Sequence, residues 1–561
     1  MPWLRAILPL LFAALVPAPD PDLILEGATV YVAPDAPPAK LSILVRDGKI
    51  AFVADPSEVR RQSPKGRTID LSGSFVFPGW SDAHGHLEGL GQALEIADLR
   101  GAPDAAEAAR RMAAKAAALP RGVWAQGRGW DQNPWPGSAF PDARNLDQVL
   151  PDRPAVARRV DGHAIWVNRA ALEMAGVTAA TPDPEGGRIL RRPDGSPSGV
   201  LIDNAKALVE RVRPAASPTD TERWLLAATR ACARVGLTEV QDASGYGAEA
   251  LAVLERLAAR GQLPVRVYAT TSPDSKHLAE CLRKGVRIGK GGDFLTVRAV
   301  KGYADGALGS RGAALLADYS DEPGWRGLPV MAPERLDALA LETRKNGWQL
   351  WIHAIGDRGN RTALDAFRKA VLAVPDAPAG GTRPRVEHAQ VVAAEDLPRF
   401  GFEGVIASVQ PTHATSDMPW AEKRVGPDRI AGAYAWKTLL KTGAKLAGGS
   451  DFPVESEDPR LGFYAAVARK DLEGRPEGGW RPAERLSRTE ALALFTTAGA
   501  WAAFEEDRRG RIAPGFDADL TVFSADPMTV PEERIPSTPV VLTLVAGRVA
   551  YGAGKAPRPR P

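Results

Sequence analysis

The chain has 561 residues, of which 44% are hydrophobic and 25% charged, and its formal net charge at pH 7 is only +3. A chain of this length exceeds what one hydrophobic core usually holds, so two or three domains are expected. The small net charge gives no reason to expect binding to nucleic acid or to a membrane surface, and a small molecule is therefore the expected partner.

Residues 1–20 are expected to form a secretory signal peptide. Arg5 precedes an apolar run over residues 6–16, and Pro17-Ala18-Pro19 follows it. A basic start, a short apolar segment and a small-residue exit are typical of such signals, and the run is too short to cross a bilayer. We therefore expect export, to a periplasm, and no integral membrane domain. A short uncleaved anchor is the alternative.

The chain contains two cysteines, Cys232 and Cys281, and both lie in segments with a helical pattern. An oxidising compartment would allow one disulfide bond between them. The sequence does not decide whether that bond forms.

Short β-strands are expected at both ends of the chain. Residues 21–78 contain β-branched runs separated by turns such as Asp47-Gly48, and residues 508–555 contain two more such runs. Neither piece alone could bury a core, so we expect the two ends to pair into one composite β-sandwich.

Strand and helix patterns alternate over residues 79–507. Two of the strand candidates, at 122–130 and 155–163, lie in a region rich in Pro, Gly and Trp, and we assign about residues 100–225 to an inserted subdomain. The remaining strands and the helices between them predict an α/β fold with a (β/α)8 TIM-like barrel. The eight barrel strands are expected at VFPGWSDAH, LTEVQDA, VRVYATT, LTVRAVK, QLWIHA, PRVEHA, GVIASVQP and KLAGGSD.

Polar side chains stand at the ends of the first, fourth, fifth, sixth and eighth of these strands. They are His84, His86, Lys301, His353, His388 and Asp451. Because the C-terminal ends of all barrel strands open onto one face, we expect these side chains to converge. Imidazoles gathered with carboxylates form sites for a divalent metal. The sequence therefore predicts a metal-dependent hydrolase.

Together the motifs resemble those of the amidohydrolase superfamily, in particular its amidohydrolase-3 branch, which includes N-substituted formamide deformylase-like proteins. The similarity extends over about residues 23–555 and rests on PGWSDAHGHL, WVNRAAL, VKGYADGALGSRGAALL, HAIGDRGN, VEHAQ, GGSDFPV and PGFDADLTVF. The resemblance implies a metal-dependent hydrolase barrel with a composite β-sandwich beside it. It also implies that the six polar residues at the strand ends occupy the metal positions of the family.

The chemistry of the implied ligands is specific. A lysine ammonium repels a cation, so Lys301 can serve only as the carbamate that its amine forms with CO2, and that anion could bridge two metal ions. Asp451 would ligate one ion and act as the catalytic base that accepts the proton of the attacking water. Zinc is the default metal for such ligands. If Lys301 instead forms an ion pair with Asp305, the site would hold one ion.

Four further residues are candidates for binding substrate, namely His163, Asp305, Arg311 and Gln410. His163 lies in a motif shared with the family and would contact or orient the substrate, unless its role is structural. Asp305 and Arg311 lie in the loop after Lys301 and could position a substrate carboxylate or carbonyl. Arg311 could equally form an ion pair that stabilises this loop.

Tryptophans flank several motifs, and Trp130, Trp135 and Trp166 suggest an apolar or aromatic group on the substrate. The expected reaction is hydrolysis of a non-peptide C–N bond, in an amide or N-substituted formamide, by a metal-bound hydroxide. Hydrolysis of an ester, lactone or carbamate at the same site is an alternative, because the hydroxide does not dictate the leaving atom. A non-catalytic scaffold with this fold is a third reading. The oligomeric state stays open, a homodimer being the commonest form.

Overall fold

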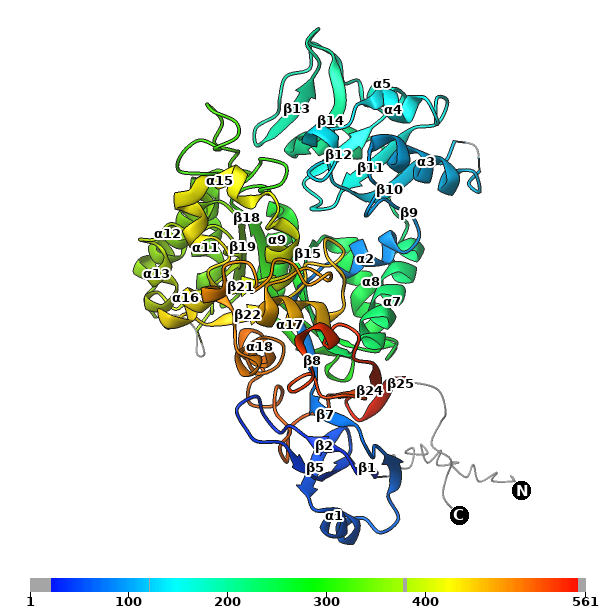
Figure 1. The fold of residues 1–561 in the computed structure, drawn as a ribbon, viewed down its shortest axis with the longest axis vertical. Helices are drawn as coiled ribbons and strands as arrows, with labels where there is room; N and C mark the ends of the chain where they lie inside the picture. Colours follow the sequence, from blue (N-terminus) through cyan, green and yellow to red (C-terminus); the bar gives the residue numbers. More distant parts are fainter. Residues whose placement is uncertain (1–21, 121, 377–380, 553–561) are drawn as a thin grey trace, which may run out of the picture.

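The computed structural model describes residues 22–120, 122–376 and 381–552. A central barrel lies between an inserted subdomain at one end and a β-sandwich at the other (Figure 1). The expected signal peptide, residues 1–20, lies outside the described residues. Within the described ranges, none of the helices combines the length and the hydropathy needed to cross a bilayer.

Eight parallel strands form the barrel, and each overlaps one of the eight segments expected from the sequence. The first three residues of the first segment, residues 76–78, belong instead to a strand of the β-sandwich. In spatial order they are β8 (Trp80–Gly85), β15 (Leu237–Tyr246), β16 (Arg266–Thr271), β18 (Leu295–Tyr303), β19 (Gln349–Ala354), β20 (Arg385–His388), β21 (Ile406–Val409) and β22 (Leu446–Gly448). A short strand, β17 (Arg287–Gly289), pairs with β18 in antiparallel orientation. The last gap is bridged where the Asp451 N–H donates to the His84 carbonyl at 2.7 Å. The (β/α)8 architecture is therefore confirmed, with the barrel nearly closed.

Helices cover the outside of the barrel, and α7 shows why they form where they do. Its N-cap Ser217 and Asp220 make a reciprocal capping box, and Pro218 occupies the first turn, where a missing N–H costs nothing. Apolar side chains then recur at helical spacing and are buried. The principal outer helices are α2 (Leu87–Ala93), α7 (Pro218–Arg234), α8 (Ala248–Ala259), α9 (Ser275–Lys284), α11 (Pro333–Lys345), α12 (Asp357–Ala373), α13 (Leu397–Phe402), α14 (Pro411–Asp417), α15 (Ala421–Arg429), α16 (Trp436–Lys441), α17 (Pro459–Ala468), α18 (Arg488–Leu494) and α19 (Thr497–Ala502).

The two cysteines lie on different helices of this layer and do not form a disulfide. Cys232 on α7 and Cys281 on α9 are both free and buried. The Cys281 sulfur lies 3.5 Å from the Thr271 hydroxyl oxygen. Burial raises the pKa of the Cys232 thiol well above its ordinary value, which keeps this thiol protonated.

The β-sandwich is built from both ends of the chain, as expected. One sheet has the order β5-β4-β1-β6, and the other has the order β25-β24-β23-β7-β2-β3. The C-terminal strand β23 pairs with the N-terminal strand β7, so the second sheet requires both ends of the chain. The strands are β1 (Leu23–Glu26), β2 (Thr29–Val30), β3 (Ala39–Lys40), β4 (Ser42–Arg46), β5 (Lys49–Ala54), β6 (Arg67–Asp70), β7 (Phe75–Pro78), β23 (Leu520–Phe523), β24 (Val540–Val545) and β25 (Arg548–Gly552), and helix α1 (Pro56–Gln62) flanks the first sheet.

The inserted subdomain is a separate six-stranded sheet between α2 and α7, with the order β13-β14-β12-β11-β10-β9. Its strands are β9 (Ala97–Asp98), β10 (Ala125–Trp130), β11 (Ala155–Arg159), β12 (Ala164–Val167), β13 (Gly187–Arg191) and β14 (Pro197–Asp203), and its helices are α3 (Ala105–Ala116), α4 (Ala143–Asp147), α5 (Arg169–Ala175) and α6 (Ala207–Glu210). The expected end of the insertion, near residue 225, falls inside α7 of the barrel layer.

The tryptophans of this subdomain belong to its core. The rings of Trp130 and Trp135 lie 6.2 Å apart between centroids, and those of Trp130 and Trp166 lie 6.4 Å apart. All three side chains are buried. The expectation that they contact an aromatic substrate group is therefore wrong, because their side chains are buried by packing within the insertion.

Candidate metal centre

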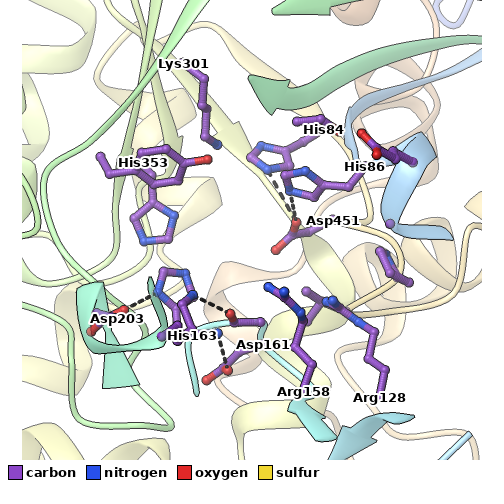
Figure 2. A pocket seen from close by; sticks show the side chains of 18 of the residues that line it. His84, His86, Arg128, Arg158, Asp161, His163, Asp203, Lys301, His353 and Asp451 are labelled. Atoms are coloured by element: carbon purple, nitrogen blue, oxygen red, sulfur yellow. Dashed lines mark hydrogen bonds and ion pairs between the residues drawn. The ribbon is translucent and has the colours of Figure 1, made fainter. Parts of the chain in front are cut away.

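A cavity of about 430 Å³ lies between the C-terminal ends of the barrel strands and the inserted subdomain. The barrel side contributes His84, His86, Lys301, His353, His388 and Asp451, all six of the expected metal residues. The opposite wall comes from the insertion and includes Arg128, Arg158, Asp161, His163, Asp203 and Lys206. Figure 2 shows these two groups facing each other across the cavity. The volume suits a small-molecule ligand.

The Asp451 carboxylate is the centre of the histidine cluster. One of its oxygens, Oδ1, lies 3.0 Å from His86 Nε2 and 3.4 Å from His84 Nε2. The other, Oδ2, lies 3.3 Å from Nε2 of His413 on α14. One ligand atom each from His84, His388 and Asp451 all lie within 4.8 Å of one another, which is close enough for a shared cation.

The ring nitrogens of this cluster suit a divalent metal. His84 Nε2 and His388 Nδ1 are buried, yet neither makes a hydrogen bond within the described residues. Burial lowers the pKa of His86, His353 and His388, so these imidazoles are neutral at pH 7. Neutral imidazole with a free lone pair is the form that binds zinc and similar ions. The residues present therefore fit a divalent metal.

Glu387 orients the first of these ligands, and sequence reasoning overlooked it. Its carboxylate contacts His84 Nδ1 and lies 2.8 Å from Arg385 Nε. Burial alone would raise the pKa of Glu387, but Arg385 and His84 lower it to about 2, so the group is ionised. A carboxylate on Nδ1 directs Nε2 of the same ring toward a metal. The motif VEHAQ contained the signal, because Glu387 is adjacent to His388.

The strand ends that carry the ligands have strained backbone and are tied together. His388 has a φ of 80° and Asp451 a φ of 60°, values that residues with a side chain rarely adopt. Buried Asp82 accepts hydrogen bonds from the His84 N–H at 2.9 Å and from the Ser450 hydroxyl at 2.6 Å. These bonds join the first and last barrel strands beside the site, which holds His84 and Asp451 in register.

Lys301 lines the cavity and forms no ion pair with any described residue. Its Nζ lies 5.4 Å from the centroid of the Tyr303 ring, and no described carboxylate is within ion-pairing distance of it. The alternative pair with Asp305 is contradicted, because the Asp305 carboxylate accepts backbone hydrogen bonds from Ala314, Ile355 and Gly356 at 2.8–2.9 Å. Burial lowers the pKa of Lys301 to about 8. A neutral amine is the form that can add CO2.

Of the four expected substrate-binding residues, the structure brings only His163 to the cavity. Its Nδ1 lies 2.7 Å from an oxygen of Asp203, and its ring centroid lies 4.9 Å from that of His353. The other three do not line the cavity. Arg311 pairs with Asp321 at 3.0 Å and so stabilises its own loop, as the alternative reading proposed.

Asp305 and Gln410 turn away from the cavity for a similar reason. Asp305 is fully buried and accepts the three backbone hydrogen bonds described above, and its Oδ1 lies 3.8 Å from His353 Nε2. The Gln410 side-chain amide donates to the Ser408 carbonyl at 3.2 Å, which bends it back toward its own strand. A role for these two residues in holding substrate is therefore not supported by their positions.

Comparison with known proteins places the site in context. Residues 67–551 match the family model described as "Amidohydrolase family". The chain is 34% identical over 535 residues to "Putative amidohydrolase YtcJ" of Bacillus subtilis (strain 168), covering 94% of this chain and 98% of that protein. It is 27% identical over 549 residues to the N-substituted formamide deformylase of Arthrobacter pascens, with coverages of 94% and 98%. Among solved structures, an uncharacterized metal-dependent hydrolase from Pyrococcus horikoshii OT3 is similar with a TM-score of 0.73 and 28% identity, covering 91% of this chain and 99% of that chain.

Proposed function

The chain belongs to the amidohydrolase family, and on that premise we propose that it hydrolyses a non-peptide C–N bond, in an amide or an N-substituted formamide, with a divalent metal. The observation that carries the proposal is a pair of buried ring nitrogens, His84 Nε2 and His388 Nδ1, which make no hydrogen bond within the described residues and belong to side chains clustered with the Asp451 carboxylate. The likeness to an N-substituted formamide deformylase supports the choice of a C–N bond.

The cavity residues would have separate roles in binding the metal, moving the proton and holding the substrate. A bound divalent ion supplies Lewis acidity, which polarises a substrate carbonyl and lowers the pKa of the attacking water. His84, His86, His353 and His388, with Asp451, would hold it. Asp451 would accept the proton of the water and return it to the leaving nitrogen. His163 faces the site from the opposite wall, and because its Nδ1–H is directed at Asp203, Nε2 of the neutral ring would accept a hydrogen bond, such as one from the N–H of a substrate amide.

Lys301 is proposed as a further ligand after carboxylation. Its neutral amine would add CO2, forming the N–C bond of a carbamate and releasing one proton to water. The support is its position on the cavity wall, its lack of an ion pair and its lowered pKa. Zinc is the proposed metal, since the donors are imidazoles and carboxylates.

Metal content tests the ligand assignment. The parent and Lys301→Ala would be purified without chelator in the presence of bicarbonate, and the metal per chain measured by elemental analysis. Two ions in the parent, falling sharply in the variant, support the carbamate. One ion in both removes Lys301 from the ligands. Lys369→Ala is the control, because that lysine is exposed and pairs with Asp337 at 2.7 Å.

Matched substrates test the reaction itself. N-formyl and N-acetyl amines would be compared with formate and acetate esters of the corresponding alcohols, using metal-loaded protein and Asp451→Asn. Hydrolysis of the amides that is lost in the variant supports the proposal. Turnover of esters alone moves the assignment to an esterase. Absence of metal even after reconstitution with zinc or manganese would overturn the hydrolase and favour the scaffold.

A further inference from the structure

Two arginines of the inserted sheet face the candidate metal centre. Arg128 on β10 and Arg158 on β11 are partners in the register of these parallel strands, and both line the cavity. Figure 2 shows their guanidinium groups side by side, pointing from the inserted sheet toward Asp451. Like charges at partner positions on adjacent strands destabilise a sheet. The pair therefore needs an explanation other than the stability of the insertion.

Arg128 has no counter-ion in the part of the chain that the structure describes. Among the described residues no carboxylate lies within ion-pairing distance of it, and its one hydrogen bond runs from Nη2 to the Val160 carbonyl at 3.2 Å. Its Nε is buried without a partner. Burial and the neighbouring Arg158 lower the pKa of Arg128 to about 10, so it remains charged at pH 7. Most of its donors are consequently free to bind a ligand.

The carboxylates on the same wall each have a partner already, although Oδ2 of Asp203 makes no hydrogen bond within the described residues. Asp161 contacts Arg159 and accepts the His163 N–H at 2.9 Å. Asp203 is bonded to His163 Nδ1. Glu210 pairs with Arg158 at 2.7 Å, which satisfies only part of that guanidinium.

Lys206 adds further positive charge to this wall. Lys206 Nζ donates to the Gly162 carbonyl at 2.7 Å and has no carboxylate within ion-pairing distance among the described residues. The insertion thus presents two cations without counter-ions, Arg128 and Lys206, to the cavity. The surroundings favour an anionic group of the ligand at this position.

We propose that the substrate carries a carboxylate that Arg128 and Arg158 bind while its amide lies at Asp451. The planar guanidinium fork matches the two oxygens of a carboxylate. The substrate class is then an N-acyl or N-formyl amino acid, an amide with an anionic group a few bonds from the scissile C–N bond. This inference rests on the proposed hydrolase function.

Binding to a protein without turnover tests the subsite separately from the reaction. Asp451→Asn, with its metal content first measured by elemental analysis, would be titrated calorimetrically with N-formyl derivatives of glycine, leucine, phenylalanine and glutamate, and with the same amides lacking the α-carboxylate. We expect at least one carboxylate to bind about tenfold or more tightly than its uncharged counterpart. Adding Arg128→Gln or Arg158→Gln should remove that difference, whereas Arg128→Lys should keep part of it.

The control is Arg169→Gln, because Arg169 is an exposed arginine of the same subdomain that pairs with Glu173. If no carboxylate outbinds its uncharged counterpart, or if Arg128→Gln and Arg128→Lys both retain the preference, the subsite is overturned. Tighter binding of the α-phosphonate analogues would assign the same arginines to a phosphoryl group instead of a carboxylate, which overturns the amino-acid class. Turnover is measured apart, with the parent enzyme. Carboxylate-selective binding without any hydrolysis would refute the proposed function and leave the subsite standing.

Discussion

At the scale of single residues, the site depends on carboxylates that do not themselves face the substrate. Glu387 is fully buried and contacts His84 Nδ1, while Arg385 compensates its charge. A neutral partner in its place would still bond the ring, but would no longer increase the electron density of the imidazole. The negative charge of Glu387 is therefore expected to matter more than its shape.

Glu387→Gln should lower metal affinity about 10–100-fold, as changes to partners of metal-bound histidines typically do. The measurement is competition between the protein and a coloured chelator at pH 7. Glu506→Gln is the matched control, because Glu506 also pairs with an arginine, Arg383, at 2.6 Å but does not line the cavity. Unchanged affinity in Glu387→Gln would show that His84 is not a ligand or that its orientation has another origin.

At the scale of elements, helix α4 shows how one side chain joins a helix to a hairpin. Asp142 is its N-cap and accepts the Arg144 N–H at 2.9 Å. The same carboxylate receives two bonds from Arg192, at 2.7 and 2.8 Å, between β13 and β14. Burial alone would raise the pKa of Asp142, but the hydrogen bonds from Arg192 and Arg144 hold it well below its ordinary value.

Asp142→Asn should destabilise the insertion by about 1–2 kcal/mol at pH 7, since it removes charge-assisted hydrogen bonds while keeping a capping side chain. A carboxyl whose folded pKa is depressed stabilises the protein above its unfolded pKa, about 3.9, and that stabilisation is lost as the pH falls further. The difference in free energy of unfolding between parent and variant, measured in urea, should therefore become smaller below about pH 4. A difference independent of pH would refute the charge argument, and exposed Asp152→Asn serves as the control.

At the scale of the whole molecule, a buried ion network fastens the β-sandwich to the closed end of the barrel. Arg509 contacts Glu505 and lies 3.0 Å from Asp517 and 3.4 Å from Glu239 of β15. Burial and the neighbouring Glu505 raise the pKa of Glu239 well above its ordinary value, whereas Arg509 acts in the opposite direction. Loss of the Arg509 cation would therefore further disfavour the ionised form of Glu239. The N-terminal face of such barrels contributes stability, not chemistry.

Arg509→Met should lower the free energy of unfolding by about 3–5 kcal/mol, because it removes the buried cation that Glu505, Asp517 and Glu239 share. Metal content should not change, since the network is remote from the cavity. Urea unfolding with fluorescence and circular dichroism would measure the loss. A loss below about 1 kcal/mol would mean that water or rearrangement compensates the carboxylates. Exposed Arg475→Met, which removes a surface pair with Asp471, is the control.

The sequence by itself determined the barrel and which histidines gather at its polar centre. Strand and helix signals alternate with a regular period, and the C-terminal ends of parallel strands necessarily share one face. His84, His353 and His388 could therefore be brought together without coordinates, and the resemblance to amidohydrolases is confirmed by the family match. Pairing of the two chain ends followed from the inability of either to bury a core.

Only the tertiary structure decided which side chains turn toward the cavity. Asp305 follows Lys301 closely in the chain, yet backbone donors from two other segments capture its carboxylate. Arg128 and Arg158 carry no recognisable motif, and they become neighbours only through the register of β10 and β11. The physical reason is that periodicity specifies local structure and the end of a strand, whereas contacts between distant segments depend on register, on packing and on competition for hydrogen bonds, none of which a single sequence displays.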